Sequence, residues 1–228
     1  MAYIKKTLSA KERKAAQQKA EEDERQLRKF VEHSVKISGD AVDWGSDDVK
    51  RHFDLALNLF NGHQYTSVAL INSTLTNTRN DWYRTGTDAS SKGLMPDAEF
   101  VEILIDELDW WIEDGLIKLR KASKRDQAAF ALQAHHRVFC VHPFKQKNSR
   151  TARLVHLEVR SLFKLPLQII TYEESKKYLA EALRFRNKKF LPNLKRYIAH
   201  ARRRQNAYRE VAWRREAKRE WKKRNAAR

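Results

Sequence analysis

Residues 142–153 join two apolar segments and read His-Pro-Phe-Lys-Gln-Lys-Asn-Ser-Arg-Thr-Ala-Arg. A loop histidine such as His142 exchanges a proton near neutral pH and can act as a base. Arg150 and Arg153 project from the same side of the first turn of the next helix, whose free amides can bind an anion. The segment therefore predicts a phosphate site beside a base, with Phe144 as an apolar plug that fixes the loop to the core.

The elements that position this segment are predicted to be helices. The 228 residues include only six glycines and four prolines, and no glycine follows Gly115. Apolar periodicity and capping residues predict an all-α chain. The predicted helices cover residues 9–36, 46–62, 65–72, 96–115, 123–139 and 148–163, with two more after residues 171 and 192. Residues 39–45 are predicted to be a linker, and the polar residues 74–95 an exposed loop or hairpin.

Composition excludes several classes of protein. The chain has 47 Lys and Arg against 29 Asp and Glu, a net charge of +18, and is 41% hydrophobic, enough to bury a core. No stretch approaches the roughly 20 apolar residues that span a bilayer, and the N-terminus lacks a secretory pattern. The single cysteine, Cys140, excludes an internal disulfide. We expect a cytoplasmic protein, and delivery into a host cell remains open if it acts as an effector.

The motif segment resembles the signature of the Fic (Fido) family, His-Pro-Phe-x-[Asp/Glu]-Gly-Asn-Gly-Arg-x-x-Arg. The resemblance extends over about residues 46–200, where Tyr83 to Gly86 followed by Met95 is similar to the family's target-docking flap. It implies a compact bundle of helices with a small β-hairpin flap. It also implies the family's usual activity, transfer of AMP from ATP to a hydroxyl side chain of a target protein.

The resemblance implies roles for particular residues. His142 would take the proton from the target hydroxyl, and Asn148 would hold the region of the α-phosphate. Arg150 and Arg153 would contact the terminal phosphates, for which bidentate guanidinium groups are well suited. The flap would hold an extended target segment by main-chain pairing. Its residues are Tyr83, Arg84, Thr85, Gly86 and Thr87.

The motif also departs from the family pattern. Gln146 replaces the acidic residue that binds Mg²⁺ in the family, and a neutral amide oxygen is a weaker ligand for a hard cation. Lys147 and Ser149 replace the two glycines of the phosphate loop, where glycine gives the backbone freedom to wrap phosphates. Our hypothesis is that Lys145 and Lys147 partly replace the charge of the metal. We therefore expect weak or altered activity, and the Doc branch of the family, which transfers phosphate, is an alternative.

Residues 67–72 are similar to the inhibitory helix of the family, Ser-x-x-x-Glu-[Gly/Asn]. In regulated members the glutamate pairs with the second arginine of the motif. Ser67 and Asn72 match this pattern, but Ile71 stands at the position of the glutamate. Because isoleucine cannot pair with Arg153, we expect no self-inhibition by this route.

Three regions are predicted: a charged N-terminal helix and linker at 1–45, a Fic-like domain at 46–200 and a basic helical extension at 201–228. The extension carries 12 basic and 3 acidic side chains, a net charge of +9. Aromatic residues among its arginines suit nucleic acid or an anionic membrane surface, and a solvated helix without a partner is an equal alternative. The alternative to an enzyme is a non-catalytic Fic-fold protein whose basic surface binds nucleic acid or a protein partner.

Overall fold

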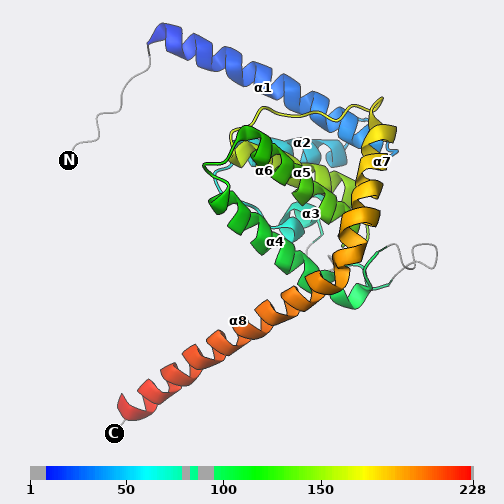
Figure 1. Ribbon diagram of the computed structural model, residues 1–228. Helices are drawn as coiled ribbons and strands as arrows, with labels where there is room; N and C mark the ends of the chain where they lie inside the picture. Colours follow the sequence, from blue (N-terminus) through cyan, green and yellow to red (C-terminus); the bar gives the residue numbers. More distant parts are fainter. Residues whose placement is uncertain (1–8, 79–82, 87–94, 227–228) are drawn as a thin grey trace.

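The computed structural model describes residues 9–78, 83–86 and 95–226, and these residues form a bundle of helices (Figure 1). The prediction of an all-α fold is confirmed. Side chains are described as far as residue 210. The α-helices are α1 (Ala10–Ile37), α2 (Asp47–Asn61), α3 (Val68–Thr76), α4 (Val101–Lys118), α5 (Lys124–Val141), α6 (Asn148–Leu162), α7 (Ser175–Phe185) and α8 (Leu191–Ala226). A 3-10 turn, Ala98–Phe100, precedes α4, and a π-helical turn, Arg186–Phe190, joins α7 to α8.

Serine caps fix the starts of four helices. Ser9 forms a reciprocal capping box with Glu12 at α1. The hydroxyls of Ser46, Ser67 and Ser123 each accept a hydrogen bond from a first-turn amide of α2, α3 and α5. Each bond satisfies an amide that has no partner within its helix. This local chemistry is why the starts of α1, α2 and α5 fall within one residue of their predicted positions.

Helix α6 lies at the centre of the bundle and carries the second half of the motif. It packs against α5, α2 and α3, and also contacts α1 and α4. All of its residues from Asn148 to Val159 are buried except Ser149. A helix held on all sides places its first turn rigidly, which is a requirement for a site built at that turn.

The N-terminal helix α1 divides into two halves. Its first half is exposed and projects past the body of the protein (Figure 1). Its second half packs against α2 and α6, and Leu27, Phe30, Val31 and Val35 are buried there. The end of α1 is therefore part of the core. At the other end of the chain, α8 runs without a break through residue 201 and projects far beyond the body.

The predicted boundaries of two helices were wrong. Helix α3 spans Val68–Thr76, not residues 65–72, because Ser67 caps it and Asn77 ends it with a left-handed conformation, φ 55°. Helix α4 does not span residues 96–115: it begins at Val101, after the 3-10 turn Ala98–Phe100, and continues past Gly115 to Lys118. Gly115 instead allows a close approach of two helices, since a Cβ atom there would lie 2.1 Å from Cζ of Phe130 on α5.

We expect Gly115→Ala to destabilise the fold by about 1–3 kcal/mol, despite the better helix propensity of alanine, because the added methyl group overlaps the ring of Phe130. Phe130 cannot retreat easily, since it also packs against Trp111 and Phe163. Urea denaturation measures the change. Gly86→Ala is the matched control, because nothing lies within 4 Å of a Cβ atom there, and its effect should be small. Equal effects of the two substitutions would contradict the packing argument.

Most of the predicted hairpin at 74–95, including Thr87, lies outside the described residues. Within the described part, residues 74–76 belong to α3, and Tyr83 forms a single antiparallel bridge with Phe144. None of the helices in the described residues is long and apolar enough to cross a membrane.

Candidate active site at the α5–α6 connection

A cavity of about 360 Å³ opens where the α5–α6 connection meets the α1–α2 connection. It combines the predicted base, the predicted phosphate loop and two carboxylates from another part of the chain. Its lining residues are Ser38, Asp40, Asp48, His142, Lys145, Gln146, Lys147, Asn148, Ser149 and Arg150. The structure therefore brings together His142 and the start of α6.

His142 ends α5 in a left-handed conformation, φ 47°, ψ 58°, which turns the chain sharply into the motif loop. Its carbonyl oxygen accepts a hydrogen bond from Nε of Arg84 at 2.9 Å. Burial, with a smaller contribution from the charge of Arg84, holds the pKa of His142 below its ordinary value. The imidazole is therefore neutral at pH 7, the state that can accept a proton.

The side chain of Asn148 holds the motif loop in place. Its Oδ1 accepts a hydrogen bond from the amide of Phe144, and its Nδ2 donates one to the carbonyl oxygen of the same residue, both at 2.8 Å. Phe144 is buried, and its ring stacks on Tyr83 with centroids 5.8 Å apart. The amide of Arg84 donates to the carbonyl of Pro143 at 2.9 Å. The described residues of the predicted flap thus fasten the loop by main-chain pairing and stacking.

Two carboxylates form ion pairs with the basic side chains at the start of α6. Asp48 accepts a hydrogen bond from Nη1 of Arg150 at 2.6 Å and also pairs with Nζ of Lys147. Asp40 pairs with the other terminal nitrogen of Arg150. Arg150 is 1% exposed, whereas the side chain of Asp40 is 55% exposed. In this conformation the charges of Lys147 and Arg150, which we expected to face a nucleotide, are neutralised within the protein.

Arg153 is held by the end of α1 and does not line the cavity. Its Nε donates to the hydroxyl of Ser34 at 2.9 Å, and its Nη2 donates to the carbonyl oxygen of Ser34 at 2.6 Å and to the hydroxyl of Ser38 at 2.7 Å. Arg153 as a whole is 1% exposed. Contact between Arg153 and a phosphate would require the end of α1 to move.

Comparison with solved structures identifies the architecture. A Fic domain-containing signalling protein from Bacteroides thetaiotaomicron superposes with a TM-score of 0.60 at 14% identity, covering 78% of this chain and 82% of that one. Fic-1 from C. elegans gives a TM-score of 0.52 at 20% identity, and the match covers 78% of this chain but 60% of that one. The chain has the Fic fold. No protein-family profile matches the sequence, and no curated protein matches it.

Within the Fic fold, the helix that resembles the inhibitory segment is α3. Ile71 is fully buried in the core, so it offers no charge to an arginine. Asn72 instead donates hydrogen bonds from Nδ2 to the hydroxyl of Thr151 at 2.9 Å and to the carbonyl of Gln146 at 3.2 Å. Ser67 caps α3. In this Fic-fold protein the second arginine of the motif, Arg153, is therefore hydrogen-bonded to the end of α1. Helix α3 supports the motif loop through Asn72.

The residues around the cavity do not fit a metal held by the protein. Gln146 supplies a neutral amide in place of the acidic group of Fic motifs, and Asp48 is already paired with Lys147 and Arg150. Among the described residues there is no cluster of three histidine, cysteine or acidic side chains with the geometry of a metal site. Hard cations such as Mg²⁺ prefer anionic oxygen ligands that are not already neutralised.

Four residues that shape this site were missed by the sequence analysis. Ser34, Ser38 and Asp40 lie at or just after the end of α1, and Asp48 lies in the first turn of α2. Their sequence signals indicate caps and a linker, because serine and aspartate are common at helix ends for local reasons. They lie about 100 residues or more from the motif in the sequence, so their contacts with the motif arginines could not be predicted from local patterns.

A buried carboxyl group supports the helix behind the loop. Glu158 on α6 is 1% exposed and accepts a hydrogen bond from the amide of Thr66 at 2.7 Å, just before α3. Burial raises the pKa of Glu158 to about 8, whereas its ordinary value is 4.5. The stability that its neutral form contributes is complete below pH 4.5 and is lost as the pH rises through about 8, since the unfolded chain releases the proton first.

We therefore expect Glu158→Gln to stabilise the protein at alkaline pH, since glutamine keeps an acceptor for Thr66 and removes the charge. The variant should match the wild type near about pH 5 and exceed its free energy of unfolding by about 3 kcal/mol at about pH 8. Urea denaturation at both pH values measures the difference. Exposed Glu113 provides the control Glu113→Gln, which should show no such pH dependence. A constant difference between the two pH values would contradict the raised pKa.

Proposed function

We propose that this chain transfers AMP from ATP to a hydroxyl side chain of a target protein. One observation carries the proposal: in a chain with the Fic fold, His142 and the first turn of α6 line the same cavity. The cavity volume of about 360 Å³ is within the usual range for small-molecule sites. The neutral state of His142 supports its use as the base.

In the proposed step, the oxygen of the target hydroxyl attacks the α-phosphorus of ATP. The bond between that phosphorus and the oxygen that bridges to the β-phosphate breaks, and pyrophosphate leaves. His142 accepts the proton of the hydroxyl, so the charge balances. The free amides at the start of α6, with Lys145 at the cavity, would stabilise the phosphate groups.

The target segment is proposed to reach this cavity along residues 83–86, which already pair with the motif loop through Arg84 and Tyr83. A hydroxyl side chain on that segment would then lie near His142. We propose the cytoplasm as the compartment, where ATP is abundant and the thiol of Cys140 stays reduced.

The pairing of Lys147 and Arg150 with Asp48 and Asp40 supports a slow reaction, because a nucleotide must displace these carboxylates before its terminal phosphates can bind Arg150. The lack of suitable metal ligands around the cavity also supports a slow reaction. No step of the proposal passes through a protein-bound metal.

Labelled ATP tests the proposal. The full chain is incubated with a matched cell lysate and ATP labelled on either the α- or the γ-phosphate, with Mg²⁺ or Mn²⁺ in the buffer. Transfer of only the α-label to protein supports AMP transfer. Transfer of only the γ-label would replace the proposal with Doc-like phosphate transfer. Failure of both labels to reach protein would support the non-catalytic alternative.

We expect the triple substitution Gln146→Glu, Lys147→Gly and Ser149→Gly to raise transfer of the α-label at least about tenfold. Lys147 has φ 59°, a left-handed conformation that glycine adopts without strain, and its removal frees Asp48 from one partner. The same lysate assay measures the gain. The control is Lys164→Gly, because Lys164 is an exposed lysine with the same left-handed conformation, φ 55°, and does not line the cavity. An unchanged rate for the triple variant would show that these three positions do not limit activity.

A further inference from the structure

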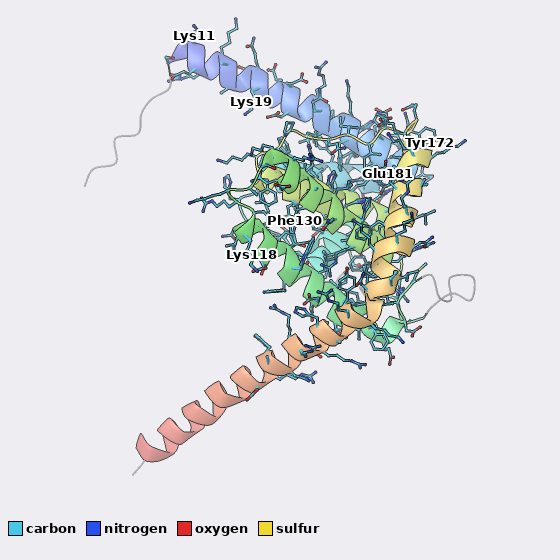
Figure 2. All side chains as sticks on the ribbon, in the orientation of Figure 1. Lys11, Lys19, Lys118, Phe130, Tyr172 and Glu181 are labelled. Atoms are coloured by element: carbon cyan, nitrogen blue, oxygen red, sulfur yellow. The ribbon has the colours of Figure 1, made fainter. Side chains whose placement is uncertain are left out.

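Two adjoining cavities lie between α4 and α8, away from the motif. The larger, of about 580 Å³, is lined by Trp110, Trp111, Arg137, Tyr197 and other residues. Figure 2 labels two of these others, Lys118 on α4 and Phe130 on α5. The smaller, of about 260 Å³, lies further along α8. The two share Trp110 and Glu107, and neither shares a lining residue with the cavity at His142. They form one continuous surface separate from the proposed transferase site.

Arg137 is a buried, positively charged residue that lines the larger cavity. It is 6% exposed, and its guanidinium lies between the rings of Trp111, at 4.6 Å, and Tyr197, at 4.8 Å. Within the parts of the chain that the structure describes, we find no hydrogen bond or ion pair from this guanidinium. Burial of a permanent charge without such a partner is costly, so an anionic group from outside the described chain would complete the site.

The two acidic groups in the lining of the larger cavity are already paired, and a third acidic residue, Asp106, lines the smaller cavity. Glu107 binds Nδ1 of His200 at 2.9 Å and lies 3.7 Å from Nε of Arg204. Asp114 binds Nζ of Lys118 at 2.7 Å. In the larger cavity, Arg137 and exposed Arg196 therefore give the lining an excess of positive charge. The ligand that fits must carry negative charge.

Flat rings accompany these arginines on the same surface. Arg204 lies 3.2 Å from the centroid of the Trp110 ring. Tyr208, which lines the smaller cavity, is 78% exposed. Nucleic-acid bases stack on such aromatic and guanidinium planes whatever their sequence. A ligand with alternating negative charges and flat rings therefore matches the surface better than an acidic peptide, whose side chains have no rings to stack.

Helix α8 extends this surface as a long basic rod. It continues from the cavities to Ala226 and projects away from the body (Figure 1). Residues 209–226 of the helix include eight basic and three acidic residues in the sequence. A helix of this kind attracts a phosphate backbone and directs it toward the cavities at its root.

We propose that the α4–α8 surface binds single-stranded nucleic acid, with bases stacked at Trp110 and Tyr208 and phosphates bound by Arg137, Arg196 and α8. A single strand fits because its bases are free to enter the cavities, whereas a duplex keeps them stacked on one another. The proposal does not depend on the transferase reaction at His142.

Fluorescence anisotropy of the full chain with labelled single-stranded oligonucleotides of uridine or thymidine, each about 20 nucleotides long, tests the proposal. We expect binding that weakens at least tenfold between about 50 and 200 mM salt. Trp110→Ala and Tyr208→Ala should each weaken binding about 5- to 30-fold, because each removes a stacking plane. Tyr172→Ala is the matched control, since Tyr172 is 52% exposed beside the start of α7 (Figure 2). It should leave binding unchanged, as should His142→Ala.

Arg137→Met separates a ligand contact from a structural one. Removal of a buried charge that has no ion-pair partner among the described residues should leave the melting temperature unchanged or raise it, while affinity for the oligonucleotide falls at least about tenfold. Four results would overturn the proposal: no binding at low salt, equal losses for Tyr172→Ala and Tyr208→Ala, tighter binding of a duplex of the same length, or unchanged affinity of a folded Arg137→Met variant. Displacement of the oligonucleotide by polyglutamate at equal charge concentration would instead indicate an acidic protein partner.

Discussion

His142→Ala should lower transfer of α-labelled AMP to protein by about 10²- to 10⁴-fold, the usual contribution of a general base. His142 is the only histidine in the cavity lining at the α5–α6 connection among the described residues. Its low pKa keeps it neutral at pH 7, so the wild-type rate should be nearly constant above neutral pH and fall in acid as the imidazole becomes charged. The lysate assay with α-labelled ATP measures the rate of each variant.

The backbone at His142 requires a second variant. Its left-handed conformation is strained for alanine, so His142→Ala could alter the loop as well as remove the base. Asparagine tolerates this conformation, and His142→Asn should lose the same activity while the melting temperature stays within about 2 °C of the wild type. His63→Ala, at an exposed histidine outside the cavity, should keep full activity. Retained activity in a folded His142→Asn variant would exclude His142 as the base.

Asp40→Asn should increase the affinity for ATP about tenfold, which corresponds to about 1.4 kcal/mol. Asp40 pairs with Arg150, and this carboxylate must leave before a phosphate can take its place. Because the side chain of Asp40 is 55% exposed, its replacement disturbs the fold little. The substitution removes a carboxylate that competes with phosphate for Arg150, and it removes one negative charge from the cavity. Both effects favour binding of ATP. Isothermal titration calorimetry with ATP measures the affinity.

Asp47→Asn is the matched control for Asp40→Asn. Asp47 is an exposed aspartate in the first turn of α2, next to Asp48, but it does not line the cavity. It should change the affinity less than twofold, since it has only the long-range effect of one charge in salt. Asp48→Asn is expected to be less informative, because Asp48 supports both Lys147 and the nearly fully buried Arg150. Unchanged or weaker ATP binding by Asp40→Asn would show that Arg150 does not bind the nucleotide.

Much of the fold follows from local sequence signals. Ser9, Ser46 and Ser123 mark the starts of three helices, because a capping hydroxyl and the amides it serves are within three residues of one another. Gly115 shows where this reasoning fails. A glycine that ends a helix and a glycine that lets another helix approach look the same in a sequence, and only the position of Phe130 distinguishes them.

The location of the candidate site was also predictable. His142, Asn148 and Arg150 lie within nine residues, so their proximity at one cavity follows from a short connection between two helices. Tyr83 and Arg84 contact the same loop, and their role in docking a target stays a prediction. Local spacing does not show which side chains from distant parts of the sequence reach the site. The net charge at the site therefore could not be predicted from the sequence.

The sequence by itself determined the helical class, the motif and the excess of basic residues. Only the tertiary structure decided what those basic residues bind. Packing of the end of α1 against α6 places Ser34 and Ser38 on Arg153, and the connection to α2 places Asp40 and Asp48 on Arg150. Arg137, by contrast, has aromatic rings on both sides and no ion-pair partner among the described residues. The physical reason is that an ion pair depends on distance in space, which helix packing sets and residue types alone do not.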